Sequence, residues 1–359
     1  MNKRIFTFFL ATAAASVLFF ACKKTDSSGS EPTGGFDKTG MLTSYADNLV
    51  LPGYNSLQQE LGNMETAVNT FIDNPVTANQ QALAPAFKKA YLQFERVSVC
   101  QFGPAETVLF GNFMNSFPPD TAAIEANITS GSYVLNTQSS MTRQGFPALD
   151  YLLFSAHAMQ DFSNGSAANR KKYVHDLIDR MKTLTAGVIT DWQNTYRAQF
   201  TGNTKTDVGS PIGYLINQLA FEMDQLKGPR IGWPFGKQSG GTVFADKCEA
   251  YYSGISLSLA IENLGSLKNY YTGGGNGKGM SDYVIALGKQ QLNTDIINQF
   301  DVVQSKLQAI PGPLSAAFTN NAAAVNDAYK EIQLLLTLIK TDLASATGVR
   351  ITYQDSDGD

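Results

Sequence analysis

Histidine is nearly absent from this sequence. The 359 residues contain two, His157 and His175, and no His-Glu-x-x-His pair occurs. Hydrolytic zinc sites usually draw on two or three good protein ligands, so a zinc peptidase is disfavoured. Two histidines would still permit a Ser-His-Asp triad, but the chain has no Gly-x-Ser-x-Gly motif. None of these common catalytic signatures is present in the sequence.

Charge is scarce as well. Asp, Glu, Lys and Arg make up 16% of the chain, the formal net charge is −4, and no Lys/Arg cluster follows the N-terminus. We therefore expect no nucleic-acid partner. The stretch TGGGNGKG (272–279) has no strand before it and no Gly-Lys-Ser/Thr ending, so it is typical of a turn and not of a phosphate-binding loop. The low charge and the 43% hydrophobic content suit an exported protein with a substantial core.

Cysteine is limited to three residues, and the first of them marks the N-terminus. A basic MNKR start and the apolar run IFTFFLATAAASVLFFA lead directly to Cys22. This order predicts a signal peptide over residues 1–21, cleavage before Cys22 and lipidation of its thiol, although Phe19 and Phe20 are bulkier than usual there. The alternative is a membrane-spanning anchor, for which the run is slightly short. Residues 22–40 then form a flexible tether.

The other two cysteines, Cys100 and Cys248, are far apart in the sequence. The cell envelope permits disulfides, so one bond could join two halves of the chain. Nothing in the sequence brings the two thiols within bonding distance, however. We favour two buried free thiols and keep the disulfide as the alternative.

Strand-like alternation is rare, and helical periodicity dominates. Leu57, Leu61, Met64 and Val68, for example, recur at spacings of three or four residues. The only credible strand is VRITY (349–353), so the fold class is predicted to be all-α. Helices are expected within residues 54–72, 74–99, 169–200, 211–226, 244–271, 281–310 and 321–347.

The helices are expected to form two packed bundles. The polar, glycine-containing loop at 200–211 is the best boundary, which places an N-terminal bundle at 41–203 and a C-terminal bundle at 204–359. Residues 64–97 and 311–343 are loosely alike, each with an alanine-rich helix after a short polar break. This likeness suggests an internal duplication.

The stretch RQGFPALDYLLF (143–154) joins a glycine, a proline and one acid to an apolar run. Pro147 suits the first turn of a helix, where its missing N–H costs nothing. Asp150 is then expected near the helix N-terminus, where a carboxylate gains about 0.3–1 kcal/mol from the helix dipole. The remnant of a metal site is the other interpretation of Asp150.

The same stretch resembles the signature of the imelysin family, Gly-x-His-x-x-Glu followed by an apolar helix. Further segments that resemble the family occur in the same order as in the family and extend over roughly residues 41–359. It implies a fold of two helical bundles with the signature near the cleft between them. The family is catalogued with metallopeptidases, after an insulin-cleaving outer-membrane protease, and it also resembles periplasmic components of iron-uptake systems. The other segments that carry the resemblance are LVLPGYNSLQQEL, VCQFGPAE, EAYYSGISLSLAIENLGSLKNYYTG and the terminal ITYQDSDGD.

The sequence departs from the signature at the positions that would bind a metal. Pro147 stands at the histidine position and Asp150 at the glutamate position. Proline cannot bind a metal, and His157 lies two helical turns beyond Asp150, about 10 Å away. Asp150 is therefore the single metal ligand that we predict here, for iron or another divalent cation.

The resemblance also nominates a set of polar cleft residues that could bind a small ligand or a cation. The terminal acids Asp355, Asp357 and Asp359 are spaced like the start of a calcium loop, but the chain ends before the required glutamate. They are either a solvated tail or partners of Arg143 or Arg230. The ligand-binding candidates are Arg143, Gly145, Asp150, Glu106, Arg230, Glu249 and Ser253.

These observations predict an imelysin-like lipoprotein anchored in the outer membrane, facing either the periplasm or the surface. The favoured function is that of a non-catalytic binding protein linked to iron or nutrient uptake. The alternatives are a divergent metallopeptidase and a surface adhesion or structural module.

Overall fold

The computed structural model describes residues 35–165, 167–275 and 277–353, and these residues fold into helices and loops without a strand. The all-α prediction is therefore confirmed. The signal peptide, Cys22 and the terminal Asp355, Asp357 and Asp359 lie outside the described residues.

Two groups of helices follow one another along the chain. The first group is α1 (Lys38–Ser44), α2 (Leu51–Asp73), α3 (Thr77–Val97), α4 (Pro104–Thr107), α5 (Phe110–Asn115), α6 (Thr121–Ser130), α7 (Gly145–Phe154), α8 (Ala158–Asp161), α9 (Ala167–Asp191) and α10 (Arg197–Gly202). The second is α11 (Pro211–Gln225), α12 (Ser256–Thr272), α13 (Met280–Ala286), α14 (Gln290–Gln308), α15 (Leu314–Asn320), α16 (Ala322–Thr337) and α17 (Ala344–Thr347). Short 3₁₀ turns occur at η2 (Ser98–Cys100), η3 (Gln138–Arg143) and η6 (Ala245–Lys247).

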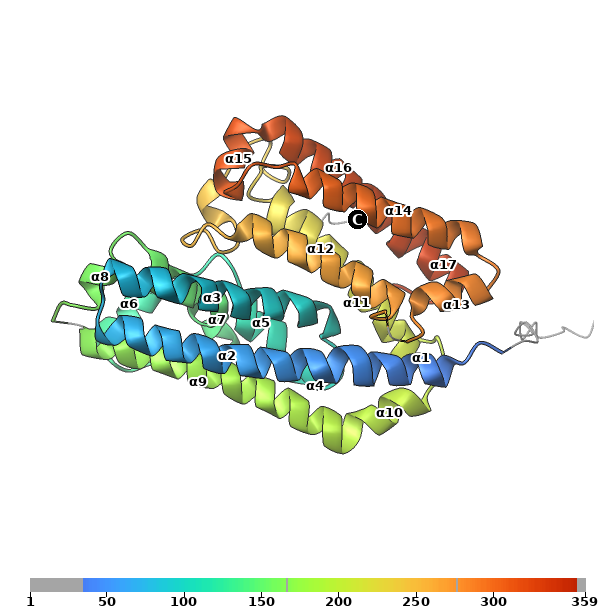
Figure 1. The fold of residues 1–359 in the computed structure, drawn as a ribbon, viewed down its shortest axis with the longest axis horizontal. Coiled ribbons are helices and arrows are strands. Elements are labelled where there is room, and N and C mark those ends of the chain that lie inside the picture. The colour runs from blue at the N-terminus through green and yellow to red at the C-terminus, as the bar shows by residue number, and fades with distance from the viewer. Residues whose placement is uncertain (1–34, 166, 276, 354–359) are drawn as a thin grey trace, which may run out of the picture. The chain divides into compact units, whose positions relative to one another are not determined.

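Each group packs around its own long helices. In the first, α2 lies against α3 and α9, and in the second, α14 lies against α12 and α16. Figure 1 shows the first group, blue to green, below the second group, yellow to red. The structure thus has the two helical bundles that the sequence predicts, and the long helices α3 and α12 join them.

One hydrophobic core runs through both bundles, because its buried residues come from every long helix. At the α3–α12 contact, Arg96 Nε lies 2.5 Å from Glu262 Oε1, and Lys88 Nζ donates to Ser258 Oγ at 3.0 Å. Residues 36–353 belong to a single compact unit, so the boundary near residue 203 stays a prediction. In the described part of the chain, no helix has the length and hydrophobicity needed to span a bilayer.

The described part of the chain contains four π turns, in which the backbone hydrogen bonds reach one residue further than in an α-helix. The π turns extend or interrupt helices that are otherwise regular, and such turns often occur at functional sites. They are η1 (Tyr45–Val50), η4 (Trp192–Tyr196), η5 (Leu226–Gly232) and η7 (Leu338–Leu343). As described below, η5 supplies a central residue of the candidate site.

The predicted strand at 349–353 is wrong. These residues follow α17 in an irregular conformation, and no strand in the part of the chain that the structure describes pairs with them. The Asn217 side chain makes the hydrogen bonds that a neighbouring strand would make. Its Nδ2 donates to Arg350 O at 2.9 Å, and its Oδ1 accepts from Thr352 N at 2.8 Å. Val349 and Ile351 pack in or against the core, whereas Thr352 is exposed, so the β-branched residues here do not indicate a sheet.

Two predicted helices are shorter than expected. Residues 244–255 are mostly irregular, since α12 begins only at Ser256, and Ala250 and Gly254 have positive φ angles of 47° and 70°. Residues 281–310 split into α13 and α14 at Gly288, whose φ is 74°. A left-handed residue ends a helix, and glycine adopts that conformation without strain.

Candidate functional site

The site is built around Arg230, whose guanidinium lies among three glutamates. Its Nη2 lies 3.0 Å from Glu95 Oε2 and 3.5 Å from Glu222 Oε1, and its Nε lies 3.3 Å from Glu249 Oε2. Glu95 comes from α3, Glu222 from α11, Arg230 from η5 and Glu249 from the loop before α12. All four are buried, with at most 5% of each residue exposed. We call these four residues the Arg230 cluster.

Neutral side chains fix the glutamates in place. Asn263 on α12 donates from Nδ2 to Glu95 Oε2 at 3.0 Å and to Ser98 Oγ at 3.0 Å. Asn115 on α5 donates from Nδ2 to Glu249 Oε1 at 2.6 Å, and the Tyr91 hydroxyl donates to Asn115 Oδ1. The cluster therefore links helices of both bundles.

Carboxyl groups outnumber cations in the cluster by three to one. Burial raises the pKa of Glu95 well above its ordinary value; Arg230 lowers it, and the charges of Glu249 and Glu222 raise it further. Burial would lower the pKa of Arg230, but Glu249, Glu95 and Glu222 more than reverse this effect, so Arg230 stays charged. The site thus holds Arg230 as a cation, carries excess negative charge and favours a proton on Glu95.

Four buried atoms of the cluster make no hydrogen bond within the described residues: Glu95 Oε1, Arg230 Nε, Arg230 Nη1 and Glu249 Oε2. Of these, Arg230 Nε and Glu249 Oε2 face each other as an ion pair at 3.3 Å. Each such group costs about 1–3 kcal/mol unless a further partner satisfies it.

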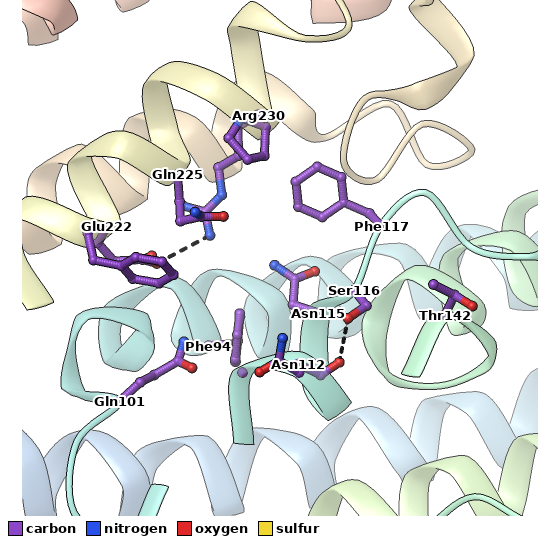
Figure 2. Close-up of a pocket in the computed structure, with 13 residues that line it drawn as sticks. Phe94, Gln101, Asn112, Asn115, Ser116, Phe117, Thr142, Glu222, Gln225 and Arg230 are labelled. Carbon is purple, nitrogen blue, oxygen red and sulfur yellow. Dashed lines mark hydrogen bonds and ion pairs between the residues drawn. The ribbon is translucent and has the colours of Figure 1, made fainter. Parts of the chain in front are cut away.

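A pocket of about 380 Å³ adjoins the cluster. Figure 2 shows Glu222, Gln225 and Arg230 on one side of it and Phe94, Asn112 and Asn115 on the other, with Phe117 reaching in from the following loop. Its size falls in the range of small-molecule sites. The pocket is lined by Phe94, Gln101, Gly111, Asn112, Asn115, Ser116, Phe117, Thr142, Phe221, Glu222, Gln225, Pro229 and Arg230.

Asp150 lies close to the cluster but has a different partner. It is buried and accepts backbone N–H groups from Tyr252 at 2.8 Å and Ser253 at 3.0 Å. Burial raises its pKa to about 6, against the lowering effect of the hydrogen bonds from Ser253 and Tyr252. The helix-dipole interpretation is wrong, because α7 begins at Gly145 and Asp150 is its sixth residue, beyond the first turn. Asp150 instead holds the turn that carries Glu249.

Of the other predicted residues, some lie at or beside the Arg230 cluster and the rest lie elsewhere. Gly145 is buried with φ 72°, and an added Cβ would lie 2.2 Å from Met114 O, so it allows α7 to approach α5 closely. The Arg143 carbonyl accepts from Tyr173 Oη at 2.7 Å, and the Arg143 side chain is not among the pocket residues. Glu106 is exposed and lies at a separate hollow. Of the predicted set, the structure thus brings Arg230 and Glu249 together directly, with Asp150 and Ser253 beside them.

Sequence reasoning missed Glu95 and Glu222, which complete the cluster. Each acid lies on the buried face of an apolar helix, Glu95 beside Phe94 on α3 and Glu222 beside Met223 on α11. A charged residue on such a face is rarely buried without a partner. A search of the apolar stripes for acids could have found both.

The residues present do not fit a metal at Asp150. Both carboxylate oxygens already accept N–H groups, and Pro147 offers no ligand. Across residues 35–165, 167–275 and 277–353, no group of three or more His, Cys, Asp and Glu side chains is arranged to hold a metal ion. In the Arg230 cluster, the guanidinium occupies the place between the carboxylates that a cation would take. Cys100 and Cys248 are buried free thiols, as the sequence favoured.

Comparison with known proteins agrees with this architecture. The chain is 25% identical over 323 residues to iron-regulated protein A of Synechococcus elongatus, covering 85% of this chain and 83% of the relative. A crystal structure described as an iron-regulated protein A precursor, from Parabacteroides distasonis, superposes with a TM-score of 0.74 at 19% identity, covering 89% of this chain and 97% of that one. An imelysin-like protein from Psychrobacter arcticum gives 0.69 at 18% identity, covering 88% and 97%. The imelysin family model matches residues 50–341, and the chain therefore belongs to the imelysin family.

Proposed function

We propose that this protein is a lipid-anchored, non-catalytic binding protein of the cell envelope that serves the uptake of iron or another nutrient. The observation that carries the proposal is the polar pocket beside the Arg230 cluster, where helices of both bundles meet. Lipidation at Cys22 holds the chain at the outer membrane. The ligand enters the pocket and is not chemically changed there.

Binding explains the residues of this site better than peptide hydrolysis does. A metallopeptidase needs a metal-bound water and a base beside it. Here the histidine position of the signature is Pro147, and the oxygens of Asp150 hold the Tyr252–Ser253 turn. The pocket wall offers amides, hydroxyls, one carboxylate, one guanidinium and aromatic rings, a combination that orients a small ligand.

The link to iron rests on the name of the relative. Iron-regulated protein A is described by its regulation, and family membership extends this association to the present chain. Uptake is the role that we infer for a protein of this kind in the envelope.

A deletion strain tests the proposal in the cell. Under iron limitation, we expect lower cellular iron, measured by mass spectrometry, and restoration by the wild-type gene. Glu222→Gln should accumulate normally but fail to restore iron, because it alters the pocket wall. Cys22→Ala should move the protein from the membrane fraction to the soluble fraction.

Two results would favour the alternatives. Cleavage of insulin by purified residues 23–359, lost in Asp150→Asn, would indicate a metallopeptidase. No iron phenotype and no cleavage, with a partner protein recovered by crosslinking, would indicate an adhesive or structural module.

A further inference from the structure

The pocket beside the Arg230 cluster has an electrostatic preference. Three carboxyl groups share one guanidinium, so two negative charges remain when all of them are ionised and one remains when Glu95 is protonated. Glu222 brings this charge to the pocket wall. Its contacts with Arg230 and Asn263 both use Oε1, so its second oxygen takes part in neither.

Aromatic rings face the same space. Phe94, Phe117 and Phe221 line the pocket, and Figure 2 shows the Phe94 and Phe117 rings on different sides of it. An organic cation is attracted to the face of an aromatic ring and, at the same time, to a carboxylate. The amide oxygens of Asn112 and Gln225 add acceptors for N–H groups.

We propose that the pocket binds a small organic cation, a protonated amine whose ammonium group lies against Glu222 between the Phe94 and Phe117 rings. This inference rests on the proposed function, because it assigns a ligand class to the same pocket. A hard metal ion would find one carboxylate, the Arg230 guanidinium and several neutral groups on the wall, and the rings would contribute nothing to its coordination. An anion would add to the excess negative charge, since the charge of Arg230 is already shared by three glutamates.

Binding of a cation is coupled to the proton on Glu95. Burial and the neighbouring carboxylates raise the pKa of Glu95. A positive ligand beside Glu222 offsets that repulsion and lowers the pKa of Glu95, so part of the proton is released on binding. This release distinguishes the proposed site from nonspecific binding to an exposed acid.

The test uses four ligands of one chain length and purified residues 23–359. Putrescine carries two ammonium groups, butylamine carries one, 1,4-butanediol is neutral, and succinate is a dianion. By isothermal titration calorimetry at neutral pH, we expect the amines to bind at one site per chain, and the diol and succinate to bind more weakly by at least about tenfold. Titration in buffers of different ionisation enthalpy measures the proton release.

Matched variants locate the site. Glu222→Gln keeps the shape of the wall and should weaken amine binding by on the order of tenfold, whereas Phe117→Leu removes one ring and should weaken it severalfold. Asp301→Asn, in an exposed ion pair with Lys268, is the control and should have no effect. Glu95→Gln should abolish the proton release, because the titrating carboxyl group is gone. Circular dichroism confirms that each variant is folded.

The outcomes separate the ligand class from the function. Tighter binding of succinate than of putrescine would overturn the cation assignment and leave a binding protein. Amine binding that is unchanged in Glu222→Gln would overturn the location. If none of the four ligands binds while the deletion strain still loses iron, the ligand class is wrong and the uptake function stands. If both the binding and the iron phenotype are missing, both proposals fail.

Discussion

Replacement of Arg230 by methionine is the perturbation that tests the description of the cluster most directly. Methionine nearly fills the volume of the arginine stem but removes the one cation of the Arg230 cluster. Glu95, Glu222 and Glu249 then face one another with side-chain exposures between 0% and 3%. Nothing else in the cluster can offset their charge.

The expected cost follows from the burial of the cluster. Removing one partner of a buried ion pair destabilises a protein by about 3–5 kcal/mol. For a chain of this size, that corresponds to a fall in Tm on the order of 10 °C. The loss should depend on pH through Glu95, whose folded-state pKa lies above its ordinary value of 4.5. The stability that Glu95 contributes is fully present below pH 4.5 and is lost as the pH rises through its folded-state pKa. Removal of Arg230 raises the folded-state pKa of Glu95 further.

Thermal unfolding followed by circular dichroism measures the effect. We expect a larger loss at about pH 8 than at about pH 5. Arg197→Met is the matched control, since Arg197 forms a 2.6 Å pair with Asp47 in which both side chains are about 40% exposed. That substitution should cost less than about 1 kcal/mol. If Arg230→Met is no more destabilised than Arg197→Met at the higher pH, the cluster does not depend on its guanidinium and this reasoning is wrong.

Three further predictions follow from buried features. Burial raises the pKa of Asp150 from 3.8 to about 6, so the wild type should lose roughly 2 kcal/mol of stability relative to Asp150→Asn as the pH rises from about 4 to about 6. Urea unfolding of the two proteins at both pH values measures this difference, and its absence would refute the prediction. Gly145→Ala should lower the free energy of unfolding by more than about 2 kcal/mol, because residue 145 has a positive φ and the added Cβ would clash with backbone. Gly187→Ala, in open space on α9, should instead raise the free energy of unfolding by about 0.5–1 kcal/mol. Cys100 and Cys248, whose pKa values burial raises to about 12 and about 11, should resist alkylation until the chain is unfolded, and labelling followed by mass spectrometry checks this.

The helices were the predictable part of the fold, because periodicity reports directly which face is buried. Leu57, Leu61, Met64 and Val68 are all fully buried along α2. The irregular segment 244–255 could not be foreseen in the same way. Its backbone N–H groups bond to Asp150, which is 102 residues away from Tyr252 in the sequence. The local sequence of residues 244–255 does not indicate a hydrogen-bond partner that lies so far away in the chain.

The candidate site was predictable in part. The family resemblance nominated Arg230 and Glu249, which do meet, and it also nominated Glu106, which lies at another hollow. Glu95 and Glu222 were missed because each reads locally as one acid in an amphipathic helix. Only the packing of α3 against α12, and of α11 against α12, brings their charges together. The sequence pattern of a single helix does not show which charged residues of other helices are buried next to it.

The π turn η5 fixes how many residues the chain must have between Glu222 and Arg230, as well as which residues they are. Glu222 and Arg230 are eight residues apart, which is about 2.2 turns of an α-helix and would place them roughly a fifth of a turn out of line. The wider turn at Leu226–Gly232 reduces the rotation per residue and returns Arg230 toward Glu222. Deleting one residue there would rotate the following side chain by about 100° and detach the arginine from its glutamates. Among related chains, insertions and deletions should therefore accumulate in the surface loops and avoid this segment, even where its individual residues vary.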